Sequence, residues 1–192
     1  MEMGKECLRL DLHDFQVEAI HALAHLHSNI LCVRGTGSGK SAIIRGAAVV
    51  LEGVTIVVEP LHSVQADQTI STVIPGFVVH NLDLTKDPAA QAKVKNHIDG
   101  LTSRKNACTI INTSPQSLLS SSVWSPTIKG AFQRGVVSLI ANDEAHKTAQ
   151  DEAYFRPEFA ALASIFALAR DSPLPVAELH TAATLTRQLY AE

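Results

Sequence analysis

Two short polar segments, each directly after an apolar run, constrain the fold of this chain more than any other feature. The first is Thr36-Gly37-Ser38-Gly39-Lys40-Ser41, which follows the apolar run 30–33 and opens a helix-forming stretch. The second is Asp143-Glu144-Ala145-His146, which ends the apolar run 136–140. A strand, a glycine-rich turn and a helix make a loop that can cradle phosphates, and an acidic pair after another strand can hold a metal ion.

The chemistry of these residues predicts ATP and Mg²⁺ as the cofactors. Glycines let backbone N–H groups converge on phosphate oxygens, and the helix that follows points its positive end at them. We expect Lys40 to contact the β- and γ-phosphates and the hydroxyl of Ser41 to bind Mg²⁺. Asp143 is expected to reach the same ion, while Glu144 orients and activates the attacking water.

A plainer interpretation of both segments stays open at this point. The first glycine of the general phosphate-loop pattern falls on Arg34, so the segment 36–41 could be a glycine-rich turn with an incidental lysine. An acidic pair after a strand is often a solvated turn or the start of a helix. The strand before the glycines and the helix after them favour the nucleotide site.

Short β-branched runs alternate with helical patterns along the chain, which predicts an α/β fold with a mostly parallel sheet. At 192 residues the chain suits one well-buried domain. Ser120-Ser121-Ser122 and the pair Ser125-Pro126 indicate a loop. The expected strands are 30–33, 54–58, 76–80, 108–112, 136–141 and 175–179, and the expected helices are 14–27, 40–51, 62–72, 87–98 and 157–169.

Composition and charge limit the classes of function. Hydrophobic residues make up 46% and charged residues 18% of the chain, as in an ordinary globular protein. The net charge of -3 gives no global attraction for nucleic acid, so any DNA contact needs a local basic patch. The three cysteines show no paired spacing, which argues against a disulfide framework or a zinc site. We find no signal peptide or membrane span, and expect a soluble intracellular protein without a membrane partner.

Several further segments resemble those of superfamily 2 helicases, and specifically the first RecA-like domain of RecQ-type DNA helicases. The segments follow one another in the same order as in that family. The segment 60–68 resembles the family's PLxSLxxDQ run, Ser114-Pro115-Gln116 its TPE segment, and Asp143 to His146 its DEAH box. The segment 155–159 resembles the FRPEY run, and the segment 12–20 resembles FRxxQxEAI. The resemblance covers nearly the whole chain.

This resemblance implies a three-layer RecA-like P-loop domain over residues 1–192 and the ATP-binding half of a 3′–5′ DNA helicase. It implies that Gln16 reads adenine, that His146 links the ATP and DNA sites, and that Phe155 and Arg156 belong to the coupling or DNA-binding segment. DNA is the implied partner, with a second RecA-like domain acting in trans. A nuclear location is implied in a eukaryote, and a cytoplasmic one otherwise.

The chain also departs from the family pattern. Asp151 and Ala153 stand where the family has an aromatic residue and a histidine that couple DNA to hydrolysis. The segment 180–184 resembles the family's TATAT motif only loosely, Asn142 replaces an apolar residue, and Glu178 lies in a run expected to be a buried strand. We also expect the second RecA-like domain to be missing, and with it an arginine worth roughly 10³–10⁵ in rate.

Two alternative functions stay open, and the departures favour the first of them. The first is a non-catalytic nucleotide- or DNA-binding module that has lost motor activity. The second is a small P-loop kinase, whose length would fit but which does not explain the segments 60–68 and 155–159. A fragment or truncated paralogue of a RecQ-like helicase is the favoured interpretation.

Overall fold

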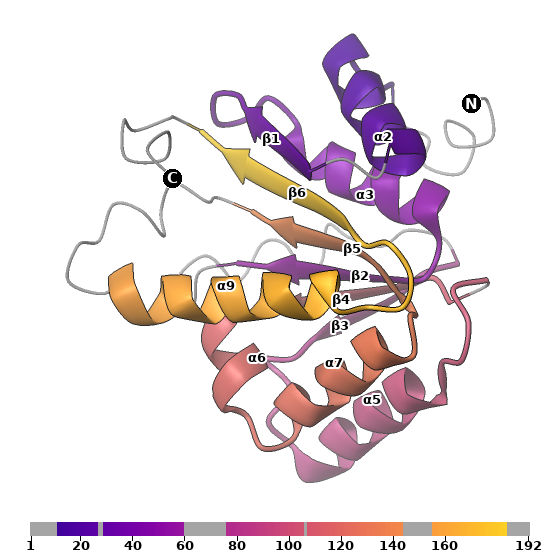
Figure 1. Ribbon diagram of the computed structural model, residues 1–192, viewed down its shortest axis with the longest axis vertical. Helices are drawn as coiled ribbons and strands as arrows, with labels where there is room; N and C mark the ends of the chain where they lie inside the picture. Colours follow the sequence, from indigo (N-terminus) through magenta and orange to yellow (C-terminus); the bar gives the residue numbers. More distant parts are fainter. Residues whose placement is uncertain (1–10, 27–28, 60–75, 106, 144–154, 184–192) are drawn as a thin grey trace.

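The computed structural model describes residues 11–26, 29–59, 76–105, 107–143 and 155–183, and these form a six-stranded parallel sheet with helices on both faces (Figure 1). The strands are β1 (Asn29–Val33), β2 (Val54–Val58), β3 (Val78–Asn81), β4 (Thr109–Thr113), β5 (Val137–Asn142) and β6 (Ala177–Ala182). The described helices are α2 (Asp14–Leu26), α3 (Lys40–Leu51), α5 (Pro88–Gly100), α6 (Pro115–Ser120), α7 (Trp124–Gln133) and α9 (Phe155–Arg170). This confirms the predicted α/β class.

The order of strands in the sheet is β1-β6-β5-β2-β4-β3, and every neighbouring pair is parallel. The strand β6, the last of the described strands, therefore lies between β1 and β5. Because all strands run the same way, their carboxyl ends meet at one edge of the sheet, where ligands bind in folds of this kind.

Side chains alternate across the sheet and build two hydrophobic clusters. Along β2, Val57 packs beneath α2 and α3, whereas Ile56 and Val58 pack against the helices of the other face. The first cluster takes Ile20, Leu23, Ile43 and Ala47 from α2 and α3, and the second takes Ile98, Ile128, Phe132 and Ile165 from α5, α7 and α9. The sheet is thus the middle of three layers, as Figure 1 shows.

Most predicted elements match the observed ones within two residues, and the exceptions have physical causes. The last strand was expected at 175–179 but runs from Ala177 to Ala182, since prolines 173 and 175 cannot donate hydrogen bonds to a sheet. The prediction of a loop at Ser125-Pro126 was wrong, because both residues lie in the first turn of α7. The predicted helix 62–72 lies outside the described residues.

No helix in the described part is long and apolar enough to cross a bilayer.

Candidate functional site

The predicted phosphate loop lies between the edge strand β1 and helix α3. Gly37 and Gly39 adopt positive φ angles of 78° and 82°, a left-handed conformation that side-chain-bearing residues rarely take. Gly39 is the N-cap of α3, and no side chain caps the backbone N–H groups of that helix end. The loop therefore presents the free N–H groups at the start of a helix, which is the arrangement that binds anions.

Lys40 is buried at the first position of α3, with 6% of its surface exposed. Its ammonium group donates hydrogen bonds to the carbonyl oxygens of Arg34 at 2.8 Å and Gly35 at 3.2 Å. These two carbonyls belong to the loop between β1 and α3, so the ammonium group of Lys40 is held against the start of that loop. A phosphate that binds here would replace these carbonyl oxygens as the acceptor of the ammonium's hydrogen bonds.

The open space and the polar groups of the loop fit a chain of phosphates. The hydroxyl of Ser38 is buried and has no hydrogen-bond partner among the described residues. A methyl group added at Gly35 or Gly37 would meet no atom within 4 Å. Because buried hydroxyls nearly always have a partner in native proteins, the Ser38 hydroxyl is a suitable donor to a phosphate oxygen bound in this loop.

Gln16 lies on α2 directly against the loop and is 3% exposed. Its Nε2 donates a hydrogen bond to the carbonyl oxygen of Gly39 at 2.9 Å, and its Oε1 accepts one from the backbone N–H of His13 at 2.7 Å. Gln16 therefore caps the start of its own helix and joins that helix to the phosphate loop. Its predicted contact with adenine stays a prediction.

The guanidinium of Arg34 stacks over the ring of Phe15, with Cζ 4.6 Å from the ring centroid. This pair joins β1 to α2 beside the loop, in the same way as Gln16 does one residue further along. In the sequence, Arg34 is notable only as the residue that replaces a glycine of the phosphate-loop pattern. An aromatic residue next to Gln16 was the signal that could have indicated the pair.

Asp143 directly follows β5 at the carboxyl edge of the sheet, and 4% of its surface is exposed. Its backbone N–H donates to the carbonyl oxygen of Val58 at 3.0 Å, which extends the β5–β2 ladder by one residue. The hydroxyl of Thr181, on β6, donates a hydrogen bond to Oδ1 of Asp143. A buried carboxylate oriented in this way is a suitable oxygen ligand for Mg²⁺.

Lys40 and Asp143 lie at the same edge of the sheet and on either side of one strand. The loop of Lys40 leaves β1, Asp143 follows β5, and β6 lies between these strands. The backbone N–H of Arg34 donates to the carbonyl oxygen of Ala182 on β6 at 3.0 Å, so β6 contacts both sides of the site. Two strand spacings are about 10 Å, a span that a nucleotide triphosphate with its cation can bridge.

The remaining predicted site residues are placed only in part. Glu144 and His146 lie outside the described residues, as do Asp151, Ala153 and the segment 60–68. Phe155 and Arg156 begin helix α9, and their side chains are outside the described part. Ser41 follows Lys40 in the first turn of α3 and is partly exposed at the loop, which suits its predicted role as a Mg²⁺ ligand.

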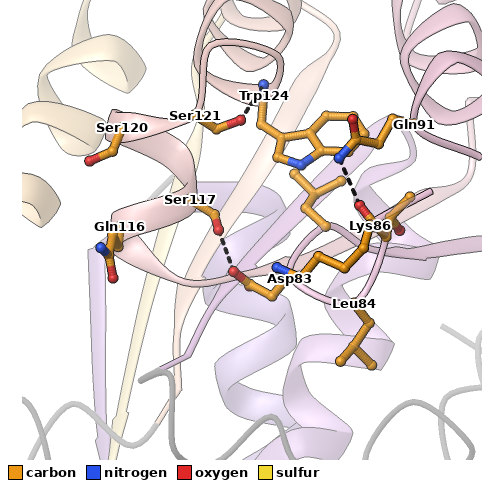
Figure 2. A pocket seen from close by; sticks show the side chains of 11 residues that line it. Asp83, Leu84, Lys86, Gln91, Gln116, Ser117, Ser120, Ser121 and Trp124 are labelled. Carbon is orange, nitrogen blue, oxygen red and sulfur yellow. Dashed lines mark hydrogen bonds between the residues drawn. The ribbon is translucent and has the colours of Figure 1, made fainter. Parts of the chain in front are cut away.

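A separate hollow of about 530 Å³ lies at the other end of the same sheet edge (Figure 2). Its wall includes the turn after β3, the first turn of α6 and Trp124 at the start of α7. The carboxylate of Asp83 accepts hydrogen bonds from the N–H and hydroxyl of Ser114 and from the hydroxyl of Ser117. No residue of the phosphate loop lines this hollow, so it is not the nucleotide site.

A three-layer parallel domain with a phosphate loop after its first strand and an acidic residue after another strand belongs to the class of P-loop nucleotide-binding domains. The family model for DEAD/DEAH box helicases matches residues 13–191 of this chain. The chain therefore belongs to the DEAD/DEAH box helicase family.

Curated relatives narrow the resemblance to RecQ-type helicases, as the sequence motifs predicted. The chain is 31% identical over 149 residues to the RecQ-like DNA helicase blm-1 of Caenorhabditis elegans, which covers 78% of this chain and 15% of that protein. It is 29% identical over 168 residues to the ATP-dependent DNA helicase RecQ of Bacillus subtilis, covering 87% of this chain and 27% of the relative. The chain thus spans only a minor part of these relatives.

Solved structures confirm the helicase type of fold. The crystal structure of the DUF1998 helicase MrfA superposes with a TM-score of 0.70 at 18% identity, over 97% of this chain and 29% of that one. MrfA bound to DNA and AMPPNP gives a TM-score of 0.67 at 19% identity, over 97% of this chain and 26% of that one.

Proposed function

We propose that this chain is the ATP- and Mg²⁺-binding half of a RecQ-like DNA helicase. The observation that carries the proposal is the placement of Lys40 and Asp143 at one edge of the sheet, on either side of β6. The unpartnered hydroxyl of Ser38 and the free helix end at Gly39 supply the polar groups that phosphates need.

Each residue of the proposed site has one role. Backbone N–H groups of 36–40 hold the phosphates, Lys40 neutralises their charge, and Ser41 and Asp143 hold Mg²⁺. Bound Mg²⁺ would neutralise charge that develops on the phosphates. Thr181 orients the carboxylate of Asp143 through its hydrogen bond. We propose that Glu144 acts on the attacking water and Gln16 on adenine.

DNA and a second RecA-like domain are the proposed partners, since a motor needs two domains that close around ATP. The second domain would complete the other wall of the cleft in trans. We therefore expect the chain alone to bind nucleotide but to hydrolyse it slowly, and not to unwind DNA.

The test is equilibrium binding of a fluorescent ATP analogue with Mg²⁺, followed by ATPase assays with and without single-stranded DNA. Wild type should bind the analogue, and Lys40→Ala should weaken binding by at least about tenfold because a buried charge partner is lost. Lys129→Ala, an exposed position on α7, is the control. Equal binding by wild type and Lys40→Ala contradicts the proposal.

The ATPase assay separates the helicase half from a non-catalytic module. Turnover that disappears in Glu144→Gln supports an active hydrolase, whereas tight nucleotide binding without turnover supports a module that has lost motor activity. Stimulation by single-stranded DNA would show that the departures at Asp151 and Ala153 leave the coupling intact.

A further inference from the structure

Two neighbouring residues of α2 contact the two ends of the phosphate loop. The ring of Phe15 lies against the guanidinium of Arg34, the residue that directly follows β1, with Cζ 4.6 Å from the ring centroid. Gln16 donates a hydrogen bond from Nε2 to the carbonyl oxygen of Gly39, the residue directly before α3, at 2.9 Å. Consecutive residues of one helix therefore hold positions that are five residues apart in the loop.

Each of these contacts is anchored in regular structure. The backbone N–H of Arg34 donates to the carbonyl oxygen of Ala182 on β6 at 3.0 Å, and its own carbonyl oxygen accepts a hydrogen bond from the ammonium of Lys40 at 2.8 Å. On the other side, Phe15 packs against the hydrophobic cluster that α2 and α3 form with the sheet (Figure 1). The contact between Phe15 and Arg34 thus joins a fixed position on β1 to a fixed position on α2.

The stretch between the two contacts is rich in glycine and open to solvent. Residues 35–37 are exposed, and a Cβ added at Gly35 or Gly37 would meet no atom within 4 Å. Glycines leave a backbone more conformations than other residues do. Without the contacts at its ends, the placement of this stretch relative to α2 would vary, and a ligand that touches both would have to fix that placement at a cost in affinity.

The residue types at positions 15 and 34 suit such a role. Arg34 is exposed and Phe15 is partly buried, so the guanidinium covers a ring that would otherwise face water at the side of the loop. A cation–π contact at an exposed site is modest, equivalent to about two- to fivefold in an equilibrium constant. A contact of this strength can adjust the affinity for a ligand without determining whether the protein folds.

We propose that Phe15 and Arg34 are positioning residues of the nucleotide site. Together with the hydrogen bond from Gln16 to Gly39, their contact holds α2 in a fixed relation to the phosphate loop. A ligand that reaches from the loop to α2 gains affinity from this arrangement, whereas a chain of phosphates that touches the loop alone does not. This inference rests on the proposed function, in which the phosphates lie in the loop and adenine lies at Gln16.

The test compares two ligands in the full chain by isothermal titration calorimetry with Mg²⁺. A non-hydrolysable ATP analogue spans the loop and α2, and inorganic tripolyphosphate spans the loop only. Phe15→Leu removes the ring and leaves every charge unchanged, and Arg34→Gln removes the guanidinium but keeps most of the length of the side chain. Lys129→Gln is the matched control, because it removes one positive charge at an exposed position on α7.

The quantity to compare is the ratio of the affinity for the analogue to the affinity for tripolyphosphate. This ratio should fall about two- to fivefold in Phe15→Leu and in Arg34→Gln, and it should fall no further in the double variant, because both changes break the same contact. Lys129→Gln should keep the wild-type ratio. A purely structural role would lower stability and leave the ratio unchanged.

The outcomes separate this inference from the proposed function. An unchanged ratio in Phe15→Leu overturns the positioning role while nucleotide binding by wild type leaves the proposed function standing. Losses that multiply in the double variant also overturn it, since each residue would then act on the ligand directly. A wild-type chain that binds neither ligand overturns the proposed function as well. If circular dichroism shows that Phe15→Leu does not fold, the exposed variant Arg34→Gln decides, and an unchanged ratio there overturns the inference.

Discussion

Thr181 on β6 donates a hydrogen bond to the carboxylate of Asp143, which follows β5, so one strand orients the acidic group that ends its neighbour. Thr181 is fully buried and Asp143 is 4% exposed. A hydrogen bond to a charged group contributes roughly 1.5–3 kcal/mol. The bond therefore matters for stability as well as for the position of a proposed metal ligand.

Thr181→Val keeps the volume of the side chain and removes the donor to Asp143. We expect the free energy of unfolding in urea to fall by roughly 1.5–3 kcal/mol, with a parallel loss of Mg²⁺-dependent nucleotide affinity. Thr181→Ser keeps the hydroxyl, so its free energy of unfolding should fall by less than about half of that amount. If both variants were equally destabilised, the methyl group rather than the hydrogen bond would be responsible.

Gly39→Ala should disturb the phosphate loop, whereas Gly35→Ala should not. Gly39 has a φ of 82°, and an added Cβ would lie 2.6 Å from Nε2 of Gln16. The left-handed backbone alone costs about 1–2 kcal/mol with a side chain. An added Cβ at Gly35 meets nothing within 4 Å, so that change should stay within about 0.5 kcal/mol. Thermal unfolding of the two variants and of wild type measures these losses of stability.

A double variant isolates the contact between Gly39 and Gln16. Gly39→Ala should be less destabilising in a Gln16→Ala background than in wild type, because the clashing amide is gone. An interaction energy above about 0.5 kcal/mol in the double-mutant cycle would confirm the coupling. Strictly additive effects would show that backbone strain accounts for the whole cost.

Thr55→Val should stabilise the protein. Thr55 is the second residue of β2 and has 1% of its surface exposed, and its hydroxyl has no hydrogen-bond partner among the described residues. Replacing an unpaired buried hydroxyl with a methyl group should raise the free energy of unfolding by about 1 kcal/mol. Thr109 is equally buried, but its hydroxyl lies 3.1 Å from Nε2 of His97. Thr109→Val is therefore the control, and it should destabilise.

The stability of the fold should fall in mild acid because of His80. Burial lowers the pKa of His80, and the neighbouring ring of His97 lowers this pKa further. At mildly acidic pH the folded state thus binds fewer protons than the unfolded state, whose histidine titrates near about 6.5. Stability is therefore lost as the pH falls through about 6.5 toward the lower pKa of the folded state.

His80→Leu should reduce this loss between about pH 7.5 and about pH 5.5, because the variant removes the group that titrates. Urea unfolding at several pH values measures the slope of stability against pH. Thr55→Val, which changes no titratable group, should keep the wild-type slope. The same slope in His80→Leu and wild type would assign the acid sensitivity to other groups.

Local pattern was sufficient to predict most of the fold. Apolar runs located all six strands to within two or three residues, and the Asp87-Pro88 signal located the start of α5, where Asp87 caps the N–H of Ala90. The same signal at Ser114-Pro115 begins α6, yet that segment was interpreted only through its family resemblance. Helix α7 was missed because its first turn contains Ser125-Pro126, and proline usually interrupts a helix. Proline has no backbone N–H, but in the first turn of a helix that N–H would have no intrahelical acceptor, so proline is tolerated there.

The site was predictable where one short segment contains it, and not where several strands assemble it. The loop of 36–41 was found from its glycines and Lys40. The contacts of Asp143 with Thr181 and with Val58 depend on the order of strands in the sheet. No local pattern contains that order, because it follows from how distant segments pack.

The strand that leads into the phosphate loop lies at the border of the sheet and pairs with β6 alone among the described strands. Through Arg34 and Thr181, β6 also positions the loop on one flank and the carboxylate on the other. A small slide of this one strand would change the width of the nucleotide site from both sides at once. A partner that contacts the carboxyl end of β6 would therefore act on both sides of the proposed nucleotide site.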